Sequence, residues 1–156
     1  MKKIINTLTT LFLLLPLMAY AEEEIRASDM AISVGVLNGG GALIGVDMEK
    51  LVTDRIGLSV GAGLVAFGAG LNIHFSPTVS SSSIRIGFNN QGTTGENVMM
   101  RSVGVSYLGR SSTGKFEWQL GLAHPFNVNQ KVKDAFGGED PPPVILTYSI
   151  GAYFAL

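Results

Sequence analysis

The chain has 156 residues, a net charge of about −1 and only 15% charged residues. This length favours a single domain, and the charge balance lacks the concentrated basic face that nucleic-acid binding needs. The sequence contains no Cys, which excludes disulfides, thiolate metal sites and a lipid anchor on a mature N-terminal Cys. Its 20 Gly disfavour a helical protein, because Gly costs about 1 kcal/mol per helix position.

The start of the chain has the three parts of a secretory signal peptide. Two Lys residues form a positive beginning, an apolar run follows over 8–18, and Ala-Tyr-Ala at 19–21 places small residues where a signal peptidase reads them. The apolar run is shorter than the roughly 20 residues of a membrane-spanning helix. We therefore predict export through the Sec pathway, cleavage of residues 1–21 and a single mature domain over 22–156.

From residue 30 onward, apolar side chains alternate with small or polar ones. A period of two is typical of β-strands, whose successive side chains point to opposite faces. We predict eight strands, at about 30–38, 41–49, 55–64, 67–75, 83–89, 98–109, 115–123 and 144–156.

The predicted strands are joined by segments with turn chemistry. Asn38-Gly39-Gly40 and the segment 111–114 are tight-turn sequences, and 90–97 is a polar loop. The longest connection, 124–143, ends in three Pro residues, which cannot donate ladder hydrogen bonds. An even strand count places both termini at the same end of the sheet.

The second face of these strands is mostly Gly, Ser and Ala. A soluble barrel would cover a water-facing surface with Lys, Glu and Thr, whereas small residues suit the narrow interior of an eight-stranded barrel. The apolar face would then meet lipid, where a sheet must close on itself because lipid offers no partner for backbone N–H and C=O groups. The pattern predicts an all-β, closed antiparallel up-and-down transmembrane β-barrel. Buried Leu58, Leu71, Leu120 and Ile150 would instead indicate a soluble carrier.

Several further residues fit a transmembrane barrel. Arg101 falls on the apolar face, either at the membrane edge or beside a bulge that shifts the register. Aromatic residues toward the strand ends are predicted to form interfacial girdles: Phe75, Phe88, Tyr107, Phe116, Trp118, Tyr148 and Phe154. Charged residues on the second face are predicted to form a polar network in the lumen: Asp47, Glu49, Arg85 and Glu117. We expect the lumen to be filled and not to form a wide pore.

The C-terminus resembles the assembly signal of bacterial outer-membrane β-barrels. That signal has a polar residue, Gly two positions later, and apolar or aromatic residues at the third-last and last positions. Ser149, Gly151, Phe154 and Leu156 occupy these places, with Leu where Phe is usual. The resemblance implies a small eight-stranded protein of the Gram-negative outer membrane, recognised by the barrel-assembly machinery, and it covers about 28–156 as a pattern.

Few residues in the sequence indicate a catalytic or ligand-binding site. His74-Phe75-Ser76 resembles the His-x-Ser motif of outer-membrane lipid A deacylases, which continues with Asn, but Pro77 follows here and His74 lies on the predicted lumen face. His124 precedes a Pro and is predicted to lie in a loop. The Gly-rich strands lack the strand–loop–helix setting that binds phosphate. We predict no cofactor and no metal site.

Three functions remain open from the sequence. The leading one is a non-enzymatic, integral outer-membrane protein with a structural, surface-interaction or envelope-homeostasis role, monomeric and in contact with outer-membrane lipid. The second is a lipid-modifying enzyme with His74 and Ser76 as its test pair. The third is a soluble periplasmic barrel that binds a lipophilic ligand in an apolar interior. The segment 131–136 offers a contact for a partner or is simply solvated.

Overall fold

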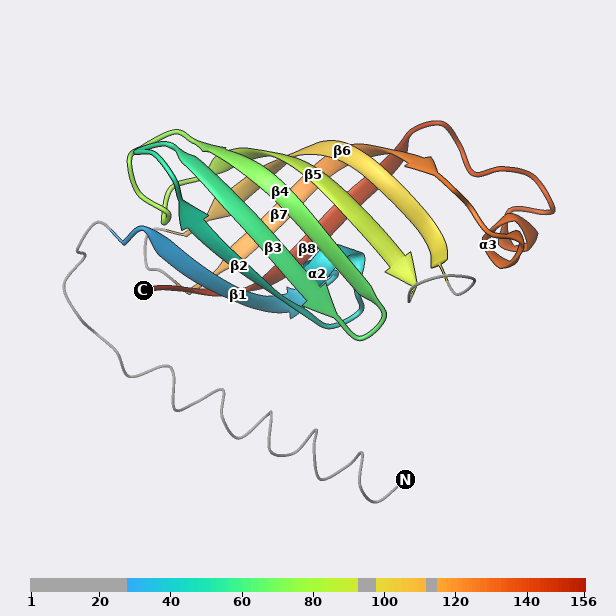
Figure 1. The fold of residues 1–156 in the computed structure, drawn as a ribbon, viewed down its shortest axis with the longest axis horizontal. Coiled ribbons are helices and arrows are strands. Elements are labelled where there is room, and N and C mark those ends of the chain that lie inside the picture. The colour runs from blue at the N-terminus through green and yellow to red at the C-terminus, as the bar shows by residue number, and fades with distance from the viewer. Residues whose placement is uncertain (1–27, 93–97, 112–114) are drawn as a thin grey trace, which may run out of the picture.

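The structure is a computed structural model that describes residues 28–92, 98–111 and 115–156. The predicted signal peptide lies outside these residues. Eight strands pair in chain order as antiparallel neighbours, and β1 also pairs with β8, so the sheet closes into a barrel (Figure 1). The strands are β1 (Met30–Val36), β2 (Gly45–Leu51), β3 (Ile56–Gly63), β4 (Ala66–His74), β5 (Ser83–Gly92), β6 (Val98–Arg110), β7 (Glu117–Phe126) and β8 (Ile145–Ala155). The predicted all-β up-and-down barrel of eight strands is confirmed.

The two ends of the barrel carry different connections. The start of β1 and the end of β8 lie at one end, together with the β2–β3 turn and the β4–β5 loop, and we call it the terminal end (Figure 1). The opposite end carries the β1–β2, β3–β4 and β7–β8 connections, and we call it the distal end.

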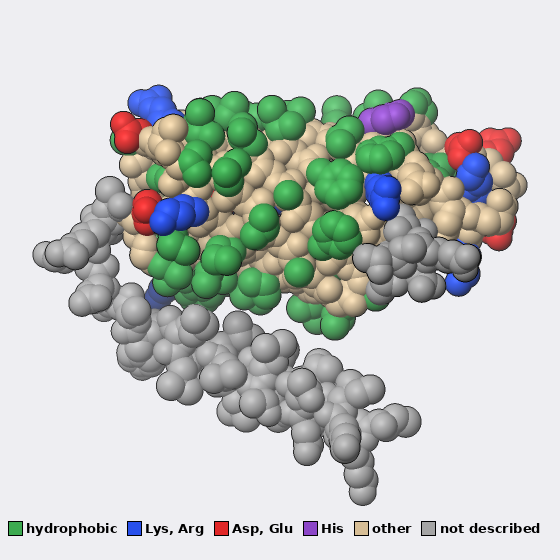
Figure 2. Space-filling model, viewed as in Figure 1, with side chains coloured by type: hydrophobic (Ala, Val, Ile, Leu, Met, Phe, Trp, Pro, Cys, Tyr) green, Lys and Arg blue, Asp and Glu red, His purple; other side chains and the backbone are tan. Residues whose placement is uncertain are grey.

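Apolar side chains cover the outside of the wall. Leu58, Leu120 and Ile150 are 52%, 47% and 50% exposed. Leu71 is half-buried and pairs with Leu58, so it shares the same face. The space-filling view shows hydrophobic side chains across the wall and charged ones gathered toward its two ends (Figure 2). The predicted orientation, with apolar side chains outward, is confirmed.

Small residues on the inward face make room for polar side chains. A Cβ on Gly57 would collide with the Glu49 carboxylate, and a Cβ on Gly61 would collide with the Asp47 carboxylate. The inward side chains that are buried are mainly hydroxyls, amides and charged groups: Ser33, Asp47, Glu49, Ser59, Asn72, His74, Ser83, Arg85, Ser102, Ser106, Glu117 and Ser149. The barrel therefore has a polar interior and an apolar exterior.

The prediction of a simple tight turn after β1 is wrong. The chain folds into the barrel as the short turn α2 (Asn38–Gly41), and β2 begins at Gly45 instead of 41 (Figure 1). Gly39, Gly40 and Gly41 have φ values of 63°, 82° and 87°, which β-strands do not use. A Cβ on Gly40 would collide with the backbone of Phe67 in β4. The glycine run thus lets backbone pack directly against the inner wall and close the distal end.

The β4–β5 loop, residues 75–82, closes the terminal end. Val79 at its centre is 0% exposed and packs with Ala31 and Tyr153, which point inward from β1 and β8. The Val79 N–H donates to the Ser28 carbonyl. The lumen therefore has a plug at each end, α2 at the distal end and Val79 at the terminal end.

Strands β5 and β7 extend three residues beyond their predicted ends. β5 continues to Gly92 instead of 89 and β7 continues to Phe126 instead of 123, because both find partners along β6, the longest strand. His124 therefore lies in β7 and not in a loop, and it pairs with Val103. The predicted loop 124–143 also contains a short helix, α3 (Gln130–Ala135), whose first turn is capped by the Asn129 side chain. Among the described residues, no helix combines the length and the apolar composition needed to cross a membrane.

Candidate functional site: a charged network inside the barrel

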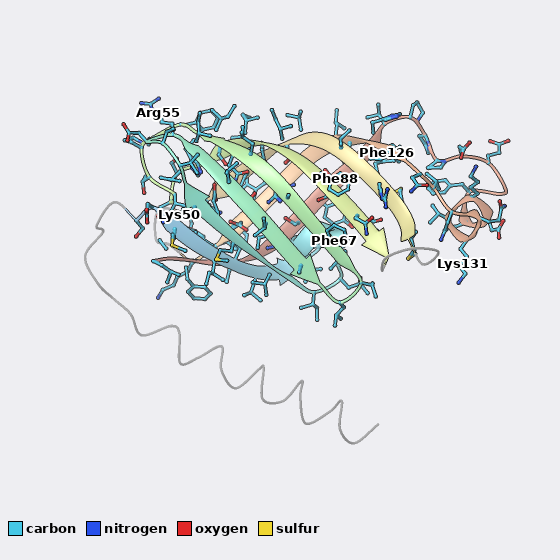
Figure 3. The ribbon with its side chains drawn as sticks, viewed as in Figure 1. Lys50, Arg55, Phe67, Phe88, Phe126 and Lys131 are labelled. Atoms are coloured by element: carbon cyan, nitrogen blue, oxygen red, sulfur yellow. The ribbon has the colours of Figure 1, made fainter. Side chains whose placement is uncertain are left out.

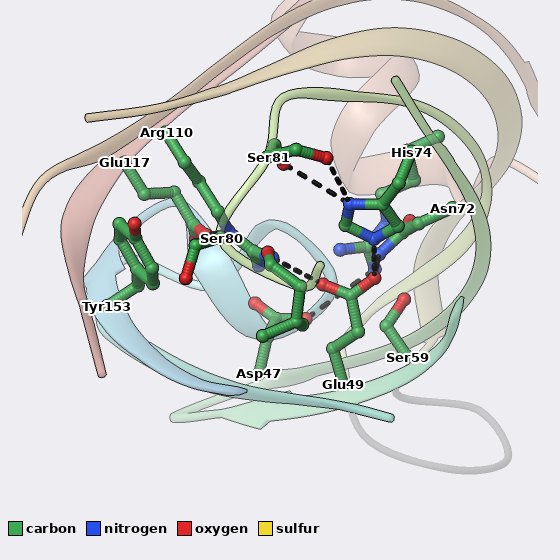
Figure 4. Close-up of polar contacts among 12 residues, drawn as sticks. Asp47, Glu49, Ser59, Asn72, His74, Ser80, Ser81, Arg110, Glu117 and Tyr153 are labelled. Carbon is green, nitrogen blue, oxygen red and sulfur yellow. Dashed lines mark hydrogen bonds and ion pairs between the residues drawn. The ribbon is translucent and has the colours of Figure 1, made fainter. Parts of the chain in front are cut away.

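Glu49 is the centre of the polar interior. Its Oε1 accepts a hydrogen bond from Asn72 Nδ2 at 2.5 Å and lies 2.7 Å from His74 Nε2. Its Oε2 lies 2.7 Å from Arg110 NH1. Figure 4 shows Glu49 between His74 on one side and Arg110 on the other. A carboxylate this deeply buried requires such partners, because an unpaired charge in a low-dielectric interior is very costly.

Arg110, at the end of β6, joins three parts of the barrel. Besides Glu49 on β2, it reaches Glu117 on β7, with Nε donating to Oε2 at 2.8 Å. NH1 also donates to the carbonyl of Val79 in the plug, and the guanidinium carbon lies 5.0 Å from the centre of the Tyr153 ring. Arg110 therefore links the wall of the barrel to the plug at its terminal end.

Asp47 links the wall to the distal plug in the same way. Its Oδ2 accepts a hydrogen bond from the Gly39 N–H in α2 at 2.7 Å, and its Oδ1 lies 3.5 Å from Arg85 NH2. Beside this pair is a cavity of about 140 Å³, lined by Asn38, Asp47, Arg85, Glu117 and Gln119 among others. The cavity has room for a few water molecules, each of which takes about 30 Å³ in the liquid.

The four residues predicted for the lumen network are placed on the inward face, in two groups. Asp47 contacts Arg85, whereas Glu49 and Glu117 meet through Arg110, which the sequence analysis missed. The predicted sixth strand ended at 109, one residue too early. The alternation of Ser102, Gly104 and Ser106, continued by two more steps, would have placed Arg110 inside.

The predicted pair His74 and Ser76 is not brought together. His74 points into the barrel and is buried, while Ser76 is exposed in the β4–β5 loop. On its Nδ1 side, His74 instead meets Ser81, whose Oγ lies 3.1 Å from His74 Nδ1. Ser81 Oγ also accepts from the Ser76 N–H and lies within donating distance of the carbonyls of Ser76 and Ser82, so it holds the loop in shape.

The interior does not suit a lipophilic ligand. The predicted soluble carrier required an apolar cavity, and the inward side chains of the described strands are polar, charged or Gly apart from a few positions near the ends. Within the described residues, no group of three or more His, Asp or Glu is arranged to hold a metal ion.

Ser149, Gly151 and Phe154 of the C-terminal motif lie on β8, the strand that closes the barrel, and Leu156 follows it directly. Gly151 faces Gly35 across the β1–β8 seam, and a Cβ on Gly151 would collide with the Val34 carbonyl. Ser149 points inward and is buried, and Leu156 is exposed. Phe154 pairs with Ile32 near the terminal end. The motif thus coincides with the strand pairing that closes the sheet.

The interior charges serve to couple the wall to both plugs, through Arg110 at one end and Asp47 at the other. Glu49, His74 and Ser81 also form a hydrogen-bonded series whose residue types occur in hydrolytic sites.

Comparison with family models, with curated proteins and with solved structures finds no match for this chain.

Proposed function

We propose that the protein is an integral outer-membrane β-barrel with a non-enzymatic, structural or surface-interaction role. The observation that carries the proposal is the closed sheet with an apolar exterior and a charged interior. Monomeric water-soluble proteins rarely expose large continuous apolar surfaces, and a closed barrel is one of the two architectures that satisfy every backbone group in lipid.

The aromatic side chains support this assignment. Phe75, Tyr107 and Trp118 form one cluster near the terminal end, with ring centroids 6.1 Å and 5.3 Å apart. Phe67, Phe88 and Phe126 form a second cluster toward the distal end, with centroids 6.5 Å and 6.4 Å apart (Figure 3). Two aromatic zones separated by aliphatic side chains are typical of the two interfaces of a membrane barrel.

The plugged lumen supports a role other than conduction. α2 and Val79 occupy the two ends, and the charged network between them leaves a cavity of only about 140 Å³. An eight-stranded barrel has little spare interior even without plugs. The surfaces left to interact with a partner are then the outer wall and the distal connections, including α3.

Two measurements test this proposal. Membrane fractions of expressing cells are run on gels with and without boiling, since folded membrane barrels resist SDS until heated. We expect the protein to remain in the membrane fraction and to migrate faster before boiling than after it. Release into the soluble fraction without detergent, together with a single unshifted band, would overturn the membrane assignment.

One observation favours a second candidate, ester hydrolysis. Ser81 Oγ lies 3.1 Å from His74 Nδ1, and Glu49 Oε1 lies 2.7 Å from His74 Nε2, as in a nucleophile, base and orienting acid. In this role His74 would accept the Ser81 proton while Ser81 attacks the ester carbonyl. His74 would then return the proton to the leaving alcohol, and water would release the acyl group.

The leading proposal assigns these groups a structural role. His74 Nδ1 also lies 3.2 Å from the Ser81 carbonyl, which can only accept a hydrogen bond, and Nε2 faces a carboxylate. If both ring nitrogens donate, the imidazolium has no lone pair with which to take the Ser81 proton. The Ser81→Ala variant, with Ser76→Ala as a matched control in the same loop, separates the candidates in a lipid A profile by mass spectrometry. An unchanged profile in Ser81→Ala removes the enzyme.

A further inference from the structure

Arg101 is an outward-facing cation within an aromatic part of the barrel wall. The register aligns Phe67 with Asn90, Asn90 with Arg101, and Arg101 with Phe126 across four neighbouring strands. Directly paired residues share a face, and Phe67 and Phe126 are exposed on the outside. The alternation of β6 is unbroken from 101 to 110, so the register shift at Gln91/Gly92 does not turn Arg101 inward.

A buried amide holds the Arg101 side chain in place. Asn90 is 1% exposed, and its Nδ2 donates to the Gly92 carbonyl at 3.2 Å. This bond fixes the amide orientation and leaves Oδ1 to accept from Arg101 Nε at 3.0 Å. Among the described residues, the two terminal nitrogens of Arg101 have no hydrogen-bond partner. Within the described residues, Asn90 thus holds the guanidinium at Nε and does not occupy its two terminal nitrogens.

The position of Arg101 suits a lipid headgroup. In the register it lies between Phe67 and Phe126, two members of the distal aromatic cluster, where we place one membrane interface. Aromatic rings collect at the headgroup level of membranes, and cations beside them attract anionic lipids. The two terminal nitrogens of a planar guanidinium can donate two parallel hydrogen bonds to a phosphate.

A shallow apolar groove begins at the pair Phe88 and Val103, two residues along β5 and β6 from the pair Asn90 and Arg101. It has a volume of about 510 Å³ on the outer wall, and its lining includes Leu58, Val60, Ala69, Ile86, Phe88 and Val103. The hollow exists because Ala69 has a small side chain between the larger Val60 and Phe88, with which it pairs. Phe88 belongs to both the groove and the aromatic cluster, so the groove runs from the cluster toward the middle of the wall.

We infer that Arg101, held by Asn90, and the adjacent groove form a binding site for a membrane lipid with an anionic phosphate headgroup. The phosphate lies on the terminal nitrogens of Arg101, and one acyl chain lies along the groove over Ala69. This inference rests on the proposed function, because both parts of the site face the bilayer only if the barrel spans it.

The test measures lipid binding by native mass spectrometry of the folded barrel released from detergent micelles. Dioleoyl phosphatidic acid is compared with dioleoyl phosphatidylcholine, which has the same chains but a headgroup of zero net charge. We expect the wild type to bind phosphatidic acid about ten-fold more tightly, because hydrogen bonds to charged groups are strong. Arg101→Gln should remove this preference. Arg55→Gln, which removes an exposed charge at the terminal end, should retain it.

Filling the groove tests the acyl-chain part of the site. Ala69→Phe should weaken phosphatidic acid binding several-fold while Arg101 keeps the preference for the anionic lipid.

An unchanged preference in Arg101→Gln overturns the site. Complete displacement of the lipid by millimolar inorganic phosphate also overturns it, because that result would show that the groove contributes nothing to binding. Insertion of each variant into phosphatidylcholine vesicles is checked in parallel. Failure of the wild type to insert contradicts the proposed function, whereas insertion without headgroup preference contradicts only the lipid site.

Discussion

Glu49 on β2 and Arg110 on β6 meet across the interior of the barrel, with Oε2 and NH1 2.7 Å apart. The two strands do not pair with each other, so this contact spans the lumen and not the sheet. Arg110 also contacts Glu117 and the carbonyl of Val79. One side chain therefore forms ion pairs with two buried carboxylates and anchors the terminal plug, so we expect its replacement to be strongly destabilising.

Replacing Arg110 tests that conclusion. Arg110→Met keeps much of the side-chain volume but leaves Glu49 and Glu117 buried without this cation. Breaking a buried ion pair by removing one partner costs about 3–5 kcal/mol, so we expect a loss of this order in the free energy of unfolding. Urea unfolding in detergent, followed by gel migration before boiling, measures it. Arg55→Met is the matched control and should change stability by less than about 0.5 kcal/mol, because Arg55 is exposed.

The combined variant Glu49→Gln/Arg110→Met/Glu117→Gln extends this experiment. With both carboxylates neutralised, the loss caused by Arg110→Met should be partly recovered. A triple variant no more stable than Arg110→Met alone would show that the lost contacts of Arg110 with Val79 and Tyr153, and not uncompensated charge, account for the effect.

The distal plug depends on glycine at position 40. Gly40 has a φ of 82° and its added Cβ would collide with the Phe67 backbone, whereas Gly138 has a φ of 91° and open space around it. Both Gly40→Ala and Gly138→Ala carry the left-handed backbone cost of about 1–2 kcal/mol. We expect Gly40→Ala to be more destabilising by at least about 1 kcal/mol in urea unfolding, because backbone cannot move aside as a side chain can. Equal losses in the two variants would mean that α2 does not pack against the inner wall.

The terminal plug depends on Val79. Val79→Asp would bury a carboxylate next to Ala31, and Val79→Thr would introduce only a hydroxyl of similar size. We expect Val79→Asp to release the 75–82 loop, which limited proteolysis of the reconstituted barrel would detect as a new cleavage in that loop. Val79→Thr should remain largely protected. A loop equally protected in both variants would contradict the packing that we describe.

The outer wall should tolerate charge at its ends and not in its middle. Ile86 pairs with Leu71 and Val105 between the two aromatic clusters, and Val52 is exposed in the β2–β3 turn. In a membrane barrel, Arg costs about 2–4 kcal/mol at the bilayer midplane and about 0–1 kcal/mol near the interface. Ile86→Arg should therefore reduce the folded fraction in lipid vesicles sharply, and Val52→Arg should not. Comparable folding of the two variants would argue that Ile86 does not face lipid.

The sequence by itself determined the strand count, the order of the strands and the face of most side chains. A period of two assigns each residue to a face without knowledge of its neighbours in space, which is why Leu58 and Leu120 were correctly placed outside and Glu49 and Glu117 on the inward face. The small residues on the second face also predicted a narrow interior, because only a closed barrel needs so little side-chain volume there.

The tertiary structure alone decided which of these residues meet. The contacts of Arg110 with Glu49, of Asp47 with Gly39, and of His74 with Ser81 instead of Ser76 all depend on barrel closure and on the path of two connections. Asn38-Gly39-Gly40 has the composition of an ordinary tight turn, and nothing local directs it inward. It enters the barrel because the closed wall has space lined by glycine and polar groups, and such a space does not exist until distant strands have paired.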